Sequence, residues 1–191
     1  NYGYEDKQKP LYNGFWRKFD MSKNFPEISG RKIVSWFELG DEGAQELEVR
    51  IALSAVSTEG ALKNLLAETS GQSFDQLKDA AAAKWRNELE VATVEGTEDQ
   101  KTMFYTSLYH TMINPSVYMD VDGRYRGIDH NIHTAEGFTN YTVFSLWDTY
   151  RALHPLFNII NRPRNTDMAN SMLAHYSQSV HGALPVWSHM G

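Results

Sequence analysis

The chain has 191 residues, a formal net charge of −6 at pH 7, 41% hydrophobic residues and no cysteine. No cluster of Lys and Arg is large enough to neutralise several phosphates, so the composition argues against a nucleic-acid binder. The lack of cysteine excludes disulfides, zinc–thiolate sites and cysteine nucleophiles, and no apolar run approaches the roughly 18 residues of a membrane span.

The first part of the chain is predicted to form β-strands. Residues 32–39 are rich in β-branched and aromatic residues, and residues 47–55 alternate apolar with polar side chains. That alternation is typical of a strand with one buried face. Residues 40–43 have turn chemistry, so we expect an antiparallel pair. Short strands and loops are expected within residues 1–29.

Helical patterns begin near Thr58. Two capping-box matches, Ser73 with Gln76 and Thr97 with Gln100, predict the starts of two further helices. The first two helices have apolar stripes at helical spacing, formed by Ala61, Leu62, Leu65 and Leu66 and by Phe74, Leu77, Ala81 and Trp85.

The third of these helices should end before Asn114-Pro115, because the residue before proline disfavours the α region. A hairpin-like insert with a turn at Asp122-Gly123 is expected over residues 117–127. A helix should follow Ser145, and Pro155 inside its pattern should kink or divide it.

A last helix is expected from about Thr166, with Gly182 as its C-terminal stop. Its inward positions are predicted to be Met168, Met172, Leu173 and Tyr176. Strands followed by helices indicate an α+β arrangement, with the change near residue 57 as the best domain boundary.

The most informative stretch runs from Tyr141 to Arg151. A β-branched and aromatic run stops at Ser145, which can cap the next helix with Asp148 three residues on. Trp147 and Asp148 then share its first turn. An indole face and a carboxylate suit a sugar, because the indole stacks on apolar C–H groups while the carboxylate accepts bonds from hydroxyls. The alternative is a buried Trp beside a helix-capping Asp.

The sequence Asp120-Val121-Asp122-Gly123 invites comparison with a calcium loop. An EF-hand loop needs glycine at its sixth position and a bidentate Glu at its twelfth. Here the glycine is fourth, and Asn131 occupies the twelfth position. We therefore reject an EF-hand and predict a solvated hairpin turn.

Asp129, His130 and His133 have a spacing that would allow metal ligands. The segment around them is rich in glycine and asparagine, so we expect a loop in which the histidines pack as polar groups. None of the other histidines forms the His-Glu-x-x-His pattern of a helical zinc site.

Motifs for the common nucleophiles and for phosphate binding are missing. The chain has no Gly-x-Ser-x-Gly elbow, no Gly-x-Gly-x-x-Gly and no Walker-type loop. Glycoside hydrolysis stays open, because it needs only two carboxylates whose spacing in the sequence is unconstrained. With 24 Asp and Glu, the sequence alone does not select the pair.

Four segments together resemble glycoside hydrolase family 92, a family of exo-acting α-mannosidases found mostly in bacteria that feed on glycans. The likeness is dense from about residue 90 to 191 and thinner before it. It is carried by Thr97 to His110, Asp120 to Gly127, Tyr141 to Pro155 and Leu184 to Ser188.

The resemblance implies a two-domain enzyme with an N-terminal β-sandwich packed on an (α/α)6 barrel. Residues 1–57 would be the end of the sandwich, residues 58–95 linking helices, and residues 96–191 the start of the catalytic barrel. The chain begins at Asn1 without Met and ends within a motif, so we expect it to be an excerpt of a longer polypeptide.

The resemblance also implies hydrolysis of terminal α-mannose with inversion, dependence on Ca²⁺, and secretion or export to a bacterial periplasm. Trp147 and Asp148 match the family's Trp-Asp pair at the terminal mannose subsite, and Trp187 is a further candidate. No position here matches the family's general acid, general base or most calcium ligands, so we assign none. The expected partners are α-mannoside glycans and the rest of the polypeptide, without which this piece should be inactive.

Two other interpretations remain. The chain would alternatively be a non-catalytic carbohydrate-binding or scaffold module, with the aromatic residues serving only the core and glycan contact. It would otherwise belong to another glycosidase built on a helical barrel, such as a trehalase-like or glucoamylase-like enzyme.

Overall fold

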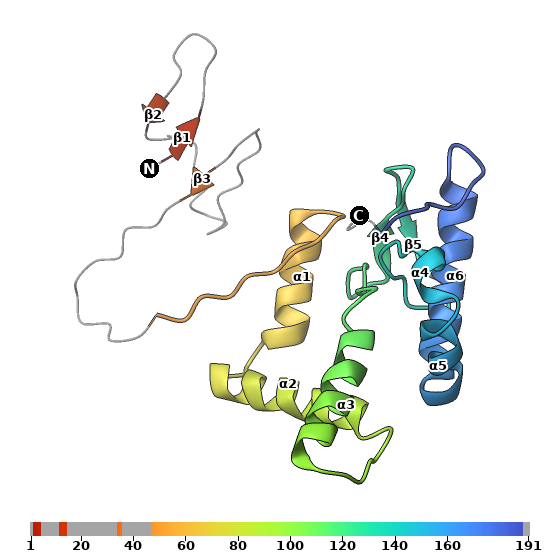
Figure 1. Cartoon of the computed structure of the whole chain (residues 1–191). Helices are drawn as coiled ribbons and strands as arrows, with labels where there is room; N and C mark the ends of the chain where they lie inside the picture. Colours follow the sequence, from red (N-terminus) through yellow and green to blue (C-terminus); the bar gives the residue numbers. More distant parts are fainter. Residues whose placement is uncertain (1, 5–11, 15–33, 36–46, 189–191) are drawn as a thin grey trace. The chain divides into compact units, whose positions relative to one another are not determined.

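The computed structural model describes residues 2–4, 12–14, 34–35 and 47–188. By its contacts the chain divides into two compact units, Asn1–Leu47 and Glu48–Gly191. Helices α1 to α6 and a small two-stranded sheet all lie in the second unit, so the described architecture is α+β (Figure 1).

The first unit contains a three-stranded antiparallel sheet in the order β2-β1-β3. Its strands are β1 (Tyr2–Tyr4), β2 (Tyr12–Gly14) and β3 (Val34–Ser35). Two short strands thus occur where short strands and loops were expected. The turn predicted at residues 40–43 lies outside the described residues.

The strand predicted over residues 47–55 is wrong. This segment is extended but pairs with no strand among the described residues, and its predicted inward side chain Ile51 is 81% exposed. It contacts helix α1 instead: Arg50 donates to the carbonyl of Thr69 at 2.7 Å, and Asn64 donates to that of Leu53 at 3.0 Å. The expected partner strand, within residues 32–39, also pairs elsewhere, because β3 pairs with β1.

Three helices open the second unit: α1 (Thr58–Thr69), α2 (Phe74–Leu89) and α3 (Glu98–Thr111). Both predicted capping boxes are present, with the Ser73 and Thr97 hydroxyls accepting from backbone N–H groups three residues on. The apolar stripes are less buried than their spacing predicts. Leu66 is 55% exposed, and no residue of α2 is buried.

After α3 the chain forms the ribbon of β4 (Arg124–Arg126) and β5 (Ile132–Thr134), an antiparallel pair in which Tyr125 lies opposite His133. The expected turn at residues 120–123 is present, closed by a bond from the Gly123 N–H to the Asp120 carbonyl at 2.9 Å. Residues 124–126 therefore pair with β5, which follows them in the chain. The predicted hairpin had paired them with the segment that precedes the turn.

The last helices are α4 (Leu146–Thr149), α5 (Leu153–Ile160) and α6 (Arg162–Gln178). The predicted division of the helix after Ser145 is confirmed, and Pro155 lies in the first turn of α5, where proline is tolerated. Helix α6 begins four residues before Thr166, because the side chain of Asn161 caps it by accepting from the N–H of Arg164 at 3.2 Å. It ends at Gln178, before the predicted stop at Gly182.

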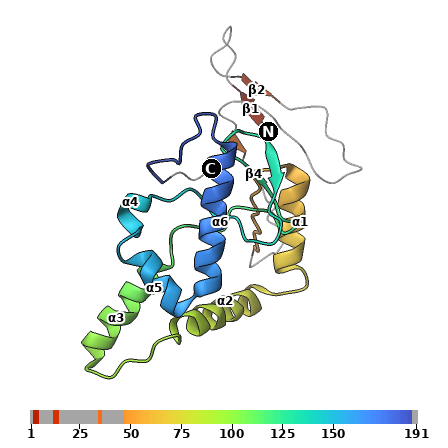
Figure 2. The same ribbon diagram turned by 90° about the vertical axis from the view of Figure 1, so that its right-hand side faces the viewer.

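A compact hydrophobic cluster lies between α5, α6 and the segment before α4. Its buried members are Tyr141, Phe144, Phe157 and Met168. Both ribbon views show α5 beside α6 (Figure 1, Figure 2). Of the positions predicted to face inward on α6, Met168 is buried, but Leu173 and Tyr176 are 67% and 52% exposed. Ser171 and His175 are buried in their place.

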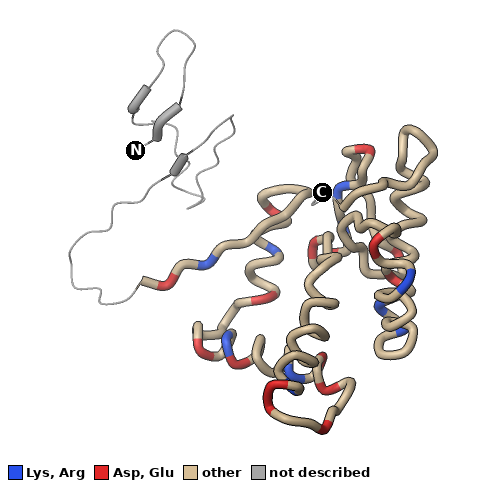
Figure 3. Tube along the Cα trace, in the orientation of Figure 1, with Lys and Arg blue, Asp and Glu red and all other residues tan. Residues whose placement is uncertain are grey.

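Acidic and basic residues are interspersed along the described trace (Figure 3). On α2 and α3 they form short-range pairs, Lys78 with Asp75 at 2.7 Å and Lys101 with Glu98 at 3.0 Å. No helix in the described part of the chain is long and apolar enough to cross a membrane.

Candidate functional site

The candidate sugar-contacting residues Trp147 and Asp148 lie on helix α4. Trp147 is 76% exposed and Asp148 is also exposed. The described residues therefore do not bury Trp147. The predicted cap is absent too, since Ser145 makes no side-chain cap bond and its hydroxyl oxygen is buried without a partner among the described residues.

The segment before α4 explains why these two side chains are outside. Residues 141–145 are all buried, from Tyr141 at 7% exposed to Phe144 at 1%. They are held in an extended conformation, in which the N–H of Thr142 donates to the carbonyl of Ser116 at 2.9 Å. The chain emerges from the core at Leu146, so the first turn of α4 presents an indole and a carboxylate at the surface of the described unit.

Trp187 lies in the segment that follows α6 and is 65% exposed. Among the described residues, no ring contact or hydrogen bond joins it to Trp147 or Asp148. The structure therefore does not bring the third candidate together with the other two.

A cavity of about 560 Å³ lies between the β-ribbon, the segment before α4 and the end of α6. Its lining residues include Tyr118, Arg126, His130, Thr142 and His175. Burial lowers the pKa of His175 and so favours its neutral form. The candidate sugar residues are not part of this lining.

Asp129 and His133 pair with each other. Nε2 of His133 lies 3.0 Å from both carboxylate oxygens of Asp129, which also accepts from the side chain of Asn131 at 2.9 Å. Hydrogen bonds from Asn131, and then from His133, lower the pKa of Asp129 to about 2. Within the described ranges no three His, Asp or Glu side chains are grouped to hold a metal.

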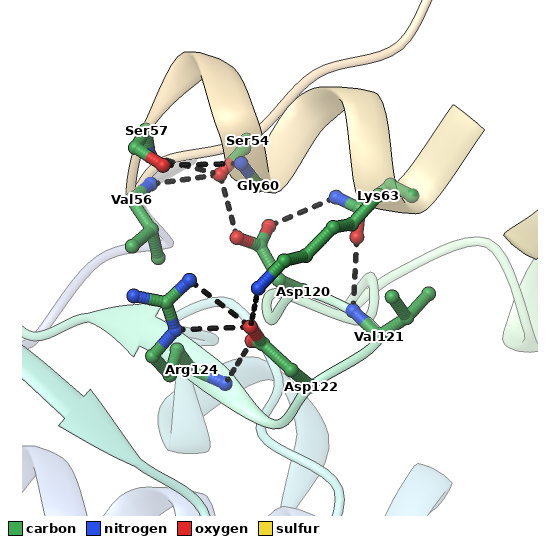
Figure 4. A network of polar contacts seen from close by, with 10 residues as sticks. Ser54, Val56, Ser57, Gly60, Lys63, Asp120, Val121, Asp122 and Arg124 are labelled. Carbon is green, nitrogen blue, oxygen red and sulfur yellow. Dashed lines mark hydrogen bonds and ion pairs between the residues drawn. The ribbon is translucent and has the colours of Figure 1, made fainter. Parts of the chain in front are cut away.

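Asp120 is not the solvated turn residue that the sequence predicts. It is only 3% exposed, and its carboxylate accepts from the hydroxyl of Ser54 at 2.7 Å (Figure 4). The carboxylate also accepts from the side-chain amide of Asn64 at 2.9 Å. Helix α1 lies so close to Asp120 at Gly60 that a Cβ added to this glycine would clash with the Asp120 carboxylate. Asp120 thus fastens the turn at residues 120–123 to helix α1.

Asp122 lies on the same turn and makes ion pairs. Its carboxylate is 3.0 Å from the guanidinium of Arg124 and 3.3 Å from the ammonium of Lys63 (Figure 4). The hydrogen bond from Arg124 is the main cause that lowers the pKa of Asp122 to about 2. Sequence reasoning missed Ser54 and Asn64 as partners of this turn, because they lie more than fifty residues before it.

The chain matches the model of the glycosyl hydrolase family 92 catalytic domain over residues 60–191. Its structure is similar to that of the family GH92 α-mannosidase BT3965 from Bacteroides thetaiotaomicron, at 53% identity and a TM-score of 0.68. The same values hold for that protein in complex with mannoimidazole. It is also similar to the family GH92 inverting mannosidase BT2199 from Bacteroides thetaiotaomicron VPI-5482, at 31% identity and a TM-score of 0.63.

These similarities cover about 70% of the chain but span only 18% of the length of each of those proteins. No curated protein matches the chain. The family match over more than half of the chain, together with 53% identity to a solved member, shows that the chain belongs to glycoside hydrolase family 92.

Proposed function

We propose that the full-length protein is an exo-α-mannosidase that removes terminal α-mannose from glycans with inversion, and that Trp147 and Asp148 contact that mannose. The observation that carries the proposal is the exposure of both side chains on one helical turn of a family 92 catalytic domain. Similarity to two solved structures, one of an α-mannosidase and one of an inverting mannosidase, supports the choice of substrate and stereochemistry.

The chemistry of the two side chains fits a hexose. The indole of Trp147 would stack on the apolar C–H face of the sugar, and the carboxylate of Asp148 would accept hydrogen bonds from its hydroxyls. Asp148 has no hydrogen-bond partner among the described residues, so its oxygens are available for such bonds. Trp187 would line the same subsite only if the rest of the protein brings it there.

The remaining parts of the proposal follow from the family. The chain would supply the end of a β-sandwich (residues 1–57), linking helices (58–95) and the first helices of an (α/α)6 barrel (96–191). The general acid, the general base and most ligands of a required Ca²⁺ would lie outside it, so this chain alone would be inactive. The enzyme would be secreted or periplasmic.

The test uses the full-length enzyme and aryl α-mannosides and α-glucosides, each with and without a chelator. We expect hydrolysis of the α-mannosides alone, loss of activity with the chelator, and a fall of orders of magnitude in Asp148→Ala with a nearly unchanged melting temperature. Hydrolysis of α-glucosides instead would favour another helical-barrel glycosidase. No hydrolysis of either would favour a non-catalytic module.

A further inference from the structure

Helix α4 cannot hold its own conformation. It has only four residues and no side-chain cap from Ser145, whereas isolated helices shorter than about 12 residues are marginal in water. The direction in which Trp147 and Asp148 point therefore depends on the contacts that fix α4 to the rest of the unit.

A chain of side-chain hydrogen bonds joins the end of α4 to α5 and α6. The hydroxyl oxygen of Thr149 lies 2.8 Å from the carbonyl oxygen of Ser145 and 3.0 Å from Nε2 of His154. Nδ1 of His154 lies 2.7 Å from Oδ1 of Asn165 on α6. Nδ2 of Asn165 in turn donates to Oδ1 of Asn158 on α5 at 2.9 Å.

The bond between Asn165 and Asn158 fixes which nitrogen of His154 carries a hydrogen. Because Nδ2 of Asn165 is the donor to Asn158, its Oδ1 is an acceptor, and Nδ1 of His154 must carry a hydrogen. The Thr149 hydroxyl has a single hydrogen and lies within hydrogen-bond distance of both Nε2 of His154 and the carbonyl oxygen of Ser145. Thr149 is therefore the residue at which the bonds within α4 and the bonds to α5 meet.

The imidazole itself is held against the core. Its ring centroid lies 5.2 Å from that of Phe144, which is 1% exposed and belongs to the buried cluster with Phe157. The imidazole is half-buried, and its contact with Phe144 limits the positions that the ring can take. Because His154 contacts both the core residue Phe144 and Thr149, it limits the movement of Thr149. Thr149 is the residue next to Asp148.

We propose that Thr149, His154 and Asn165 are positioning residues that fix α4 so that Trp147 and Asp148 face the sugar. The inference rests on the proposed function, because it assigns these three residues a role through the two proposed sugar contacts. None of the three is itself expected to touch the substrate.

The test compares Thr149→Val, which removes the hydroxyl from a side chain of the same shape, with Thr149→Ser, which keeps it. A matched control is Thr166→Val, because Thr166 on α6 also donates to the carbonyl four residues before it, at 3.1 Å. In the full-length enzyme, Thr149→Val should weaken mannoimidazole binding by about five- to tenfold. Thr149→Ser and Thr166→Val should bind like the wild type, and all melting temperatures should agree within about 3 °C.

A double variant separates positioning from a general structural effect. In the Asp148→Ala background, Thr149→Val should lower kcat/KM for an aryl α-mannoside by less than about twofold, because its effect passes largely through Asp148. An equal loss in both backgrounds would overturn the inference, and so would wild-type binding by Thr149→Val. Wild-type activity of Asp148→Ala would instead overturn the proposed function itself.

Discussion

The side-chain amide of Asn64 bridges helix α1 and the turn that contains Asp120. Its Nδ2 donates to Oδ1 of Asp120 at 2.9 Å, and its Oδ1 accepts from the N–H of Val121 at the same distance. Both ends of one amide are thus used to join segments 56 residues apart in the sequence.

Replacing Asn64 by Ala should destabilise the enzyme. It would leave the buried carboxylate of Asp120 with one bond fewer, which costs about 1–3 kcal/mol. The midpoint of urea unfolding should fall, whereas Asn87→Ala, at an exposed position of α2, should leave it unchanged. Equal midpoints for the two variants would contradict the bridging role of Asn64.

The ion pairs of Asp122 predict a dependence of stability on pH. Its pKa is about 2 in the folded protein, against an ordinary value of 3.8. Because the folded pKa is the lower one, the stabilisation is complete above about pH 4 and is lost as the pH falls through about 2. Asp122→Asn should therefore have a lower unfolding midpoint than the wild type at neutral pH, and the gap should narrow below pH 4.

A control for this effect is Asp75→Asn on α2. Asp75 forms an ion pair with Lys78 but its side chain is 77% exposed, so its removal should change the midpoint little at any pH. A gap between Asp122→Asn and the wild type that stays constant from neutral pH to pH 3 would refute the proposed contribution of the Asp122 charge.

Replacing the tryptophan of α2 or that of α4 by Ala should have opposite effects on the melting temperature and on KM. Trp147 is 76% exposed, so Trp147→Ala should leave the melting temperature nearly unchanged and raise KM for α-mannosides by about tenfold or more. Trp85 packs edge-to-face on Tyr109 with ring centroids 4.7 Å apart. Trp85→Ala should lower the melting temperature and leave KM unchanged; the reverse pattern would assign Trp147 a structural role.

Local sequence signals predicted the helices of this chain well. The capping boxes that open α2 and α3 join residues only three apart, Ser73 with Gln76 and Thr97 with Gln100. Pro155 likewise divides a helix through its own geometry. Such features need no knowledge of distant parts of the chain.

Features that depend on distant partners were not predicted. Residues 47–55 have the alternation of a strand, but a strand needs a neighbour, and this segment bonds to α1 instead. Burial of Asp120 was missed for the same reason, since the residues that satisfy its carboxylate lie far before it in the sequence. On α6, spacing alone did not distinguish the buried His175 from the exposed Leu173.

The candidate site was predictable only in part. The change from a buried β-branched run to a helix at Ser145 was visible in the sequence, and it places Trp147 and Asp148 in one turn. Their surroundings were not, because the hydrogen bonds that hold α4 come from His154 and Asn165 on later helices.

The most direct test is calorimetric titration of mannoimidazole into the full-length protein and into Asp148→Ala. Asp99→Ala is the matched control, because Asp99 is likewise an exposed Asp in the first turn of a helix. We expect the wild type and Asp99→Ala to bind equally, and Asp148→Ala to bind at least about a hundredfold more weakly with the same melting temperature. Equal binding by all three proteins would contradict a role for Asp148 in holding the sugar.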